Sequence, residues 1–172
     1  PLTLKIASLT PKGSPWDKAL RQIASEWREA SDGEINLKIY PGGIAGDEDD
    51  MIRKMRFNQI QGGIFTSQGL NGIDPNTVAL SIPFLITSNE EFDYVFEKVS
   101  PVLSEGLRDE GFEVIGWTQA GWIHIFSQEK VVYPEDLKTQ KMAASDVDPA
   151  MFEAWKDLGF TVLPIQLSEI GT

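Results

Sequence analysis

Few residues in this chain have the types and spacing that enzyme chemistry requires. The 172-residue sequence contains no Cys and a single His, which excludes a disulfide framework, a Cys-based zinc site and a thiol nucleophile. The GxSxG and GxGxxG motifs and the phosphate-binding P-loop are absent from it. The remaining pairing of base and nucleophile is His124 with Ser67 or Ser145, and no third group that would orient the histidine is identifiable. We therefore predict no catalytic residue, no metal and no cofactor.

Three other polar features have a structural explanation. His124 lies between apolar neighbours in a predicted strand, so a hydrogen-bonded histidine in the core or at an interface is favoured over a switch or a ligand. The acidic run at 47–50 is typical of a solvated helix start, and the spacing and glycine of an EF-hand calcium loop are missing. Asp148 precedes Pro149 as a helix N-cap, which leaves Asp146 as the unexplained acid of its loop.

The composition is that of an acidic globular protein. Apolar residues make up 41% and charged residues 24%, and the formal net charge is −11. These values exclude a disordered chain and argue against nucleic acid as a partner, because a phosphate backbone requires a basic face. No apolar run approaches the roughly 18 residues that span a bilayer. No basic-then-apolar signal segment is present, and the sequence begins just before a predicted strand, as expected of a processed secreted chain.

Strand and helix patterns alternate along the chain. The predicted strands are 4–7, 35–40, 63–66, 112–118, 122–126, 141–145 and 161–163, and the predicted helices begin near residues 15, 47, 88, 101 and 149. This order predicts an α/β fold with a mostly parallel sheet covered on both faces. We expect one α/β domain at 1–118, a hinge or crossing strand at 119–127 and part of a second α/β domain at 128–172.

Ligands of open α/β sheets bind outside the carboxyl ends of the strands. Five loops meet that condition in the predicted order: 8–16, 67–71, 83–87, 117–122 and 144–148. Aromatic and neutral hydrogen-bonding side chains, which line pockets for small molecules, are frequent in them. The candidate ligand-binding residues are Trp16, Ser67, Gln68, Asn71, Phe84, Trp117, Gln119 and Trp122. Core or interface packing is an equally good explanation for any single tryptophan among them.

The positions of the arginines bear on the kind of ligand. Arginine is the usual partner of a tightly held carboxylate or phosphate because its guanidinium pairs with both oxygens. All five arginines fall in predicted helices and none falls in the five loops; they are Arg21, Arg28, Arg53, Arg56 and Arg108. The predicted ligand site therefore has no arginine fork.

Four segments of the sequence resemble the solute-binding receptors of TRAP transporters. They are ASLTPKGSPW at 7–16, IYPGGIAG at 39–46, YPEDLKTQK at 133–141 and LGFTVLPIQLSE at 158–169. The resemblance implies an extracytoplasmic or periplasmic protein with a clamshell fold of the periplasmic-binding type, in which two α/β domains are joined by a hinge. Such receptors deliver a small solute to the subunits of a membrane permease and catalyse no reaction. They have roughly 300 residues, about two domains, so the resemblance also implies that this chain is an N-terminal portion.

Two positions depart from the pattern of the family. Ala143 occupies the place where the resemblance implies the arginine that holds the substrate carboxylate, and Ile123 replaces a frequent basic residue. The resemblance is therefore closest to a branch that lacks this arginine, which includes receptors associated with tetratricopeptide-repeat partner proteins. The solute implied is an organic acid or an apolar or neutral compound.

The resemblance implies that domain closure about residues 117–126 traps the solute. One side of the site would be formed by residues of the first domain and the other by residues of the second, which adds Ala143 and Ser145 to the candidates above. Two other functions are compatible with the sequence. The same fold could serve as a sensor or interaction module, and a small hydrolase would require His124 to lie beside a serine.

Overall fold

The computed structural model describes residues 1–82, 85–122, 124–145 and 149–165. The chain forms two compact units, Pro1–Phe112 and Glu113–Thr172. The domain boundaries expected from the sequence, with a hinge at 119–127, remain a prediction. Among the described helices, none is both long enough and apolar enough to cross a bilayer.

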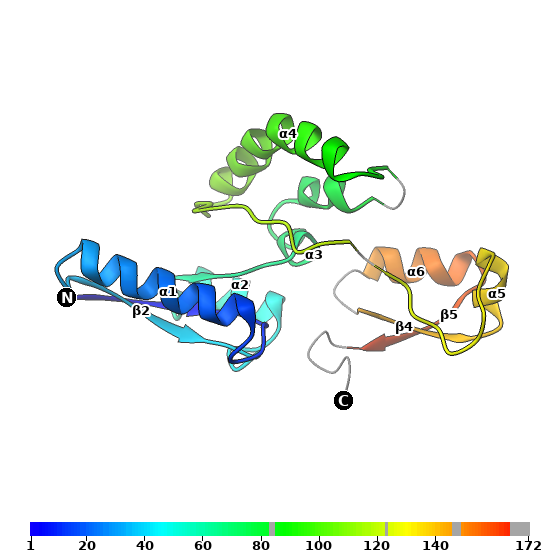
Figure 1. Cartoon of the computed structure of the whole chain (residues 1–172), viewed down its shortest axis with the longest axis horizontal. Helices are drawn as coiled ribbons and strands as arrows, with labels where there is room; N and C mark the ends of the chain where they lie inside the picture. The colour runs from blue at the N-terminus through cyan, green and yellow to red at the C-terminus, as the bar shows by residue number, and fades with distance from the viewer. Residues whose placement is uncertain (83–84, 123, 146–148, 166–172) are drawn as a thin grey trace. The chain divides into compact units, whose positions relative to one another are not determined.

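The first unit is built on a parallel sheet with strand order β2-β1-β3 (Figure 1). Strand β1 pairs with β2 from Leu2↔Ile35 to Ala7↔Tyr40, and its end pairs with β3 through Ala7↔Gly63. The elements follow the order β1 (Leu2–Ala7), α1 (Pro15–Ala30), β2 (Ile35–Tyr40), α2 (Glu48–Arg56), β3 (Gly62–Gly63), α3 (Ser67–Leu70), the 3-10 helix η1 (Pro75–Ser81) and α4 (Asn89–Asp109). The predicted alternation of strands and helices is confirmed in this unit.

Side-chain caps start the helices of the first unit at the predicted positions. The hydroxyl of Ser14 accepts from the Asp17 amide at α1 (3.2 Å), and Asp47 Oδ1 accepts from the Asp50 amide at α2 (2.7 Å). Apolar residues at helical spacing on α2 then reach the core, as predicted. That core joins the end of β1 to α2; its buried residues are Ala7, Ala45, Met51 and Ile60, with Leu9, Met55 and Phe65 packed against them.

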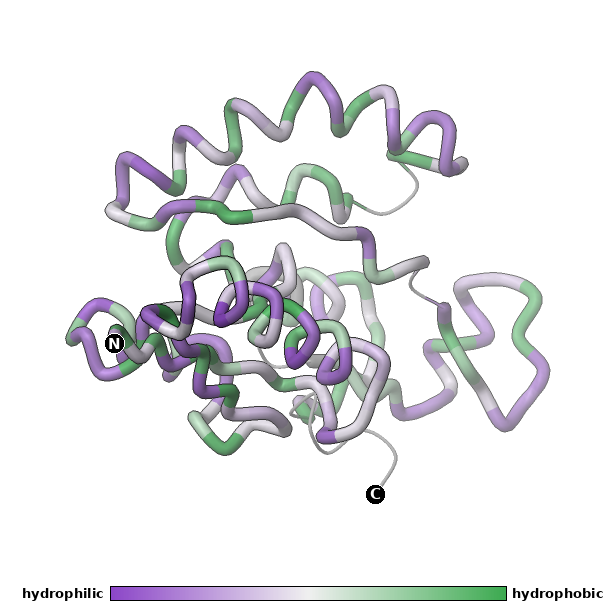
Figure 2. Tube along the Cα trace, turned by 60° about the vertical axis from the view of Figure 1, so that its left-hand side comes forward, coloured by the Kyte–Doolittle hydropathy of each residue, from purple (hydrophilic) through white to green (hydrophobic). Residues whose placement is uncertain are grey.

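Helix α4 is continuous through Pro101, although the sequence predicts a second helix beginning at that proline. A proline inside a helix removes one hydrogen bond and costs about 3 kcal/mol. Leu103 and Leu107 follow it on a fully buried face, and their burial offsets that cost. Hydrophilic and hydrophobic residues alternate along α4 (Figure 2), as expected of a helix with one apolar face.

The second unit pairs the parallel strands β4 (Lys141–Ser145) and β5 (Thr161–Ile165). Helices α5 (Pro134–Lys138) and α6 (Pro149–Asp157) complete it. The sequence predicts only a turn at the position of α5; the chain becomes helical there because Asp136 Oδ2 accepts from the amides of Val132 and Tyr133, both at 2.9 Å. The buried core consists of Leu137, Phe160 and Val162.

The strands predicted at 112–118 and 122–126 are absent from the described part of the second unit. Alternating apolar residues predict a strand, but alternation alone does not supply the neighbouring strand that a sheet requires, and no strand is formed by the described residues of these segments. His124 is exposed, so the prediction of a core histidine is wrong, while that of a histidine at an interface stays a prediction. Its ring contacts that of Phe126 at a centroid distance of 6.5 Å, so these two side chains do share a side, as the alternation predicts.

Candidate solute-binding site

The candidate site of the first unit lies where β1 and β3 end. The two strands are parallel neighbours, so the loops that follow them begin at the same edge of the sheet. The Ile64 amide donates to the Ala7 carbonyl at 3.0 Å and so extends this pairing by one bond beyond β3. The predicted strand at 63–66 is thus shorter than expected, and the chain turns directly into α3.

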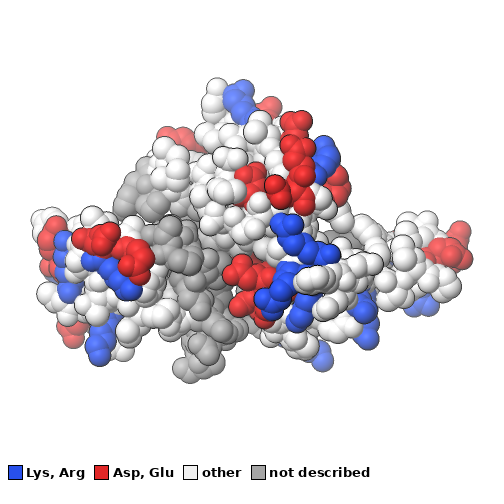
Figure 3. All heavy atoms as spheres, turned by 180° about the vertical axis from the view of Figure 1, so that it is seen from behind, with Lys and Arg blue, Asp and Glu red and all other residues white. Residues whose placement is uncertain are grey.

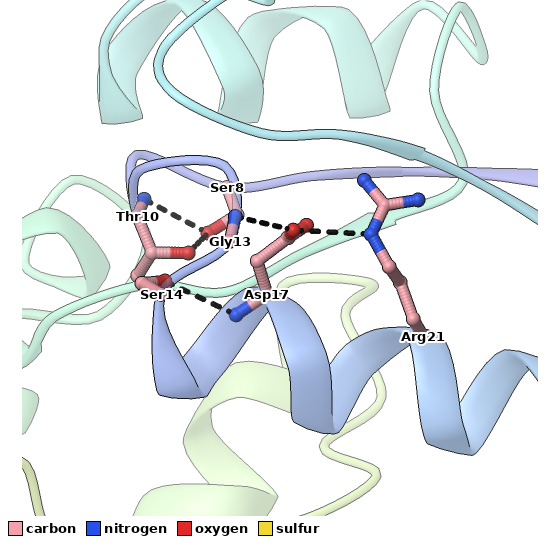
Figure 4. Close-up of polar contacts among 6 residues, drawn as sticks. All are labelled: Ser8, Thr10, Gly13, Ser14, Asp17 and Arg21. Carbon is pink, nitrogen blue, oxygen red and sulfur yellow. Dashed lines mark hydrogen bonds and ion pairs between the residues drawn. The ribbon is translucent and has the colours of Figure 1, made fainter.

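The loop after β1 is held by hydroxyl groups at its start. Ser8 is buried, and its Oγ lies 2.7 Å from Thr10 Oγ1 and accepts from the Thr10 amide at 3.0 Å (Figure 4). These short-range bonds turn the chain immediately after the strand. They fix the backbone that leads to Trp16 at the beginning of α1.

Asp17 fastens the end of the same loop to α1. Its side chain is buried, and Oδ2 accepts from the Gly13 amide at 2.8 Å and from Arg21 Nε at 3.0 Å (Figure 4). The hydrogen bond from Arg21, with that from Gly13, holds the pKa of Asp17 below its ordinary value. The other oxygen, Oδ1, is buried without a hydrogen-bond partner among the described residues.

A second buried carboxylate holds the loop after β3. Glu48, the first residue of α2, is 1% exposed. Its Oε1 accepts from the Thr66 amide at 2.5 Å and its Oε2 from the Thr66 hydroxyl at 2.8 Å. Thr66 Oγ1 in turn accepts from the Gly69 amide at 3.1 Å and caps α3. Burial raises the pKa of Glu48, and the bonds from Thr66 oppose that rise.

Helix α3 is also joined to η1. Ser67 Oγ lies 2.5 Å from Ser81 Oγ, and the Thr77 hydroxyl donates to the Ser67 carbonyl at 3.1 Å. The described hydrogen bond of the Ser67 hydroxyl is thus made with another hydroxyl, which is no general base.

Four candidate ligand residues of the first unit are described, and the structure brings three of them together. Ser67 and Gln68 form the first turn of α3 and Asn71 is its C-cap; all three are half-buried. Trp16, also half-buried, is the second residue of α1 and follows the loop from the neighbouring strand. The prediction for Phe84 lies outside the described residues.

The candidates of the second unit occupy an extended segment and one strand. Trp117 is half-buried, Gln119 is exposed and Trp122 is 44% exposed. Ala143 is exposed in the middle of β4, opposite Leu163, and Ser145 is the last residue of that strand. Their part in a ligand site remains a prediction.

The five arginines all lie in helices, as predicted: Arg21 and Arg28 in α1, Arg53 and Arg56 in α2, and Arg108 in α4. Several have acidic partners, since Arg21 pairs with Asp17, Arg53 with Asp50 and Arg56 with Glu110. Figure 3 shows basic and acidic side chains lying beside one another. Arg21 nevertheless acts on the candidate site indirectly, because its partner holds the loop after β1.

Sequence reasoning missed Glu48, Thr66 and Ser81. The acidic run does open a helix as expected, but Glu48 is buried and not part of a solvated face. A signal for this burial exists in the sequence: Glu48 precedes the buried residues Met51 and Ile52 by three and four positions, which places all three on one helix face.

Fold and site together define a class of protein: an α/β ligand-binding protein with neutral polar groups at the carboxyl ends of parallel strands. The particular family follows from a match of residues 6–172 to the family described as bacterial extracellular solute-binding protein, family 7. The chain belongs to this family.

Two curated relatives illustrate the similarity. The solute-binding protein RD1_1052 of Roseobacter denitrificans is 27% identical over 99% of this chain and 53% of the relative. The 2,3-diketo-L-gulonate-binding periplasmic protein YiaO of Escherichia coli is also 27% identical, over 84% of this chain and 44% of that protein. The chain thus spans about half the length of the curated relatives it matches.

Solved structures confirm the predicted periplasmic-binding-type α/β fold and the resemblance to TRAP receptors. A TRAP periplasmic solute-binding protein of Xanthobacter autotrophicus with bound β-D-galacturonate superposes with a TM-score of 0.87 at 20% identity, over 97% of this chain and 56% of that one. The structure of RD1_1052 with bound L-galactonate has a TM-score of 0.84 at 25% identity, over 98% and 56%.

Proposed function

We propose that this chain is the solute-capturing portion of an extracytoplasmic receptor that serves a TRAP-type secondary transporter. The observation that carries the proposal is the family match, which extends over residues 6–172. The receptor works in the periplasm or on the outer side of the membrane, after removal of a leader, and delivers its solute to the permease subunits. It performs no catalysis. Solute binding shifts an equilibrium between open and closed forms of the receptor, and the permease recognises the closed form.

The solute class follows from the polar groups at the candidate site. The half-buried turn of Ser67, Gln68 and Asn71 offers hydroxyl and amide groups, which suit the hydroxyl or carbonyl oxygens of a small solute. Asp17 Oδ2 and both oxygens of Glu48 are occupied by hydrogen bonds within the protein. The sugar acids bound by solved relatives support a small organic acid. Because Ala143 stands where the resemblance implies an arginine, neutral groups carry a larger share of the binding of the solute, and a neutral solute is the alternative.

Isothermal titration calorimetry of the full-length protein tests this site. D-glucuronate, L-galactonate and D-glucose represent acids and a neutral sugar. We expect Gln68→Ala to raise the Kd of a bound solute about twofold to tenfold, because a lost hydrogen bond is worth about 0.5–1.5 kcal/mol. Gln59→Ala, which truncates an exposed residue after α2, is the matched control. Equal affinities of the two variants would contradict the proposed site.

A gain-of-function variant tests the part of Ala143. Ala143→Arg restores the guanidinium, and a charge-assisted hydrogen bond is worth about 1.5–3 kcal/mol. We expect the affinity for D-glucuronate to rise about tenfold or more while that for D-glucose stays constant. Ala19→Arg adds the same charge at an exposed position of α1 and should change neither affinity. An equal gain from both variants would indicate long-range attraction instead of a contact.

A further inference from the structure

The buried acid at the start of α2 makes a two-point contact with the chain after β3. Glu48 is 1% exposed, and both of its carboxylate oxygens accept from Thr66, one from the amide and one from the hydroxyl. The two residues are 18 positions apart in sequence. A bidentate contact of this kind fixes the position and the orientation of the backbone at Thr66 together.

Thr66 passes this constraint to α3. Its hydroxyl donates its one proton to Glu48 and uses a lone pair to accept from the Gly69 amide. The direction of both bonds is therefore set by the carboxylate. Because Thr66 is the N-cap, the orientation of its side chain determines where the first turn of α3, with Ser67 and Gln68, begins.

Gly69 provides a second and independent constraint. A Cβ at this position would overlap the carboxylate of Glu48, so α3 lies against the acid at a distance that only glycine permits. Gly69 is itself buried. The contact between α2 and α3 thus consists of a hydrogen-bonded part at Thr66 and a steric part at Gly69.

We propose that Glu48 is a positioning residue of the solute site, which holds Thr66 and thereby fixes the turn that presents Ser67 and Gln68. The inference rests on the proposed function, in which these two side chains contact the solute. Glu48 acts through Thr66 and does not touch the solute.

Protonation of Glu48 gives this arrangement a measurable signature. Its pKa is raised chiefly by burial, and the neighbouring carboxylates Asp47 and Asp49 on the same helix raise it further. The segment packed against it, residues 66–70, contains no titratable side chain. The ionised form accepts both bonds from Thr66, whereas a proton on the carboxyl group competes with the Thr66 hydroxyl for the donor role.

Amide hydrogen exchange and calorimetry on the full-length protein test the proposal. Glu48→Gln removes the charge at nearly constant shape, and Glu105→Gln, at an exposed site on α4, is the matched control. We expect E48Q to speed exchange of the Thr66 and Gly69 amides about tenfold and to weaken D-glucuronate or L-galactonate binding about fivefold. In the unsubstituted protein, protection of these amides should fall as the pH drops through the raised pKa of Glu48, and E48Q should abolish this dependence.

Variants of Thr66 test the same hydrogen bonds even if E48Q does not fold. Thr66→Ser retains the hydroxyl and should preserve protection and affinity, while Thr66→Val should reproduce E48Q. Unchanged exchange in E48Q and T66V would overturn the proposal, as would faster exchange with unaltered solute affinity. If neither sugar acid binds the unsubstituted protein, the choice of solute in the proposed function fails; the exchange data then decide separately whether Glu48 fixes α3.

Discussion

The contact between Gly106 and Asp74 predicts a substitution whose effect has an unusual sign. Gly106 lies in the interior of α4, where replacing Gly by Ala normally stabilises a helix by about 0.8–1.0 kcal/mol. A Cβ at this position, however, would overlap Asp74 Oδ2. Asp74 is buried, and its Oδ1 accepts from the amide of Asn76 at 3.0 Å and from its side chain at 2.9 Å. The carboxylate cannot move away without weakening these bonds.

The opposing magnitudes decide the result. Overpacking of this kind costs about 1–3 kcal/mol, and weakening the Asp74 cap of η1 adds about 1 kcal/mol. Against a helix gain of about 1 kcal/mol, we expect Gly106→Ala to lower the free energy of unfolding by about 1–3 kcal/mol. In an Asp74→Ser background, where the shorter side chain retains a cap and leaves room, the same substitution should stabilise the protein by about 1 kcal/mol.

Urea unfolding followed by circular dichroism measures all four proteins of this double-mutant cycle. The expected coupling between positions 74 and 106, which is the difference between the effects in the two backgrounds, is about 2–4 kcal/mol. Stabilisation by Gly106→Ala in the original background would refute the reasoning, because the helix propensity would then outweigh the overlap. Equal effects in both backgrounds would show that Asp74 is not the obstacle.

Two further predictions concern charge and packing in the first unit. Because the bonds from Arg21 and Gly13 lower the pKa of Asp17 in the folded state, its stabilisation is present above the ordinary pKa and is lost as the pH falls through the lower folded-state pKa. In Asp17→Asn, the free energy of unfolding, measured by urea unfolding at a series of pH values, should therefore fall less steeply at acid pH. An unaltered fall at acid pH would contradict this. Leu103→Ala, at 2% exposure, should destabilise by about 3 kcal/mol. Val102→Ala, its 64% exposed neighbour, should change thermal stability by less than about 0.5 kcal/mol, and similar losses from the two would refute the assigned helix face.

The elements that local chemistry specifies were predictable from sequence. Strands at the N-terminus alternate in polarity. Ser14 and Asp47 mark the starts of their helices, because each is an N-cap whose side chain accepts from a backbone amide. The elements that failed depend on distant neighbours. The segments at 112–118 and 122–126 have the alternation of strands, but their described residues form no strand. Pro101 does not end α4, because Leu103 and Leu107 are buried beyond it.

The candidate site was predictable only in part, for a similar reason. The rule that ligands bind at the carboxyl ends of strands selects Ser67, Gln68 and Asn71, and the structure places all three in or at the end of α3. Their contact with a solute stays a prediction. The two residues that support this turn, Glu48 and Ser81, come from other elements. Because acidic side chains are mostly exposed, residue type alone predicts Glu48 at the surface. Its burial is possible because Thr66 donates hydrogen bonds to it, and only the tertiary structure brings these two residues together.

The strand order of the first sheet has a consequence for how the protein is made. Of the three described strands, β1 leaves the ribosome before β2 and β3, yet it is the middle strand of the order β2-β1-β3. Its two neighbours are therefore added one at a time, each to a free edge, and neither has to insert between strands that are already paired. Until residues 62 and 63 are translated, however, one edge of β1 near Ala7 stays open to pairing with other chains. The short strand β3 thus covers the free edge of β1 near Ala7 once it has been synthesised.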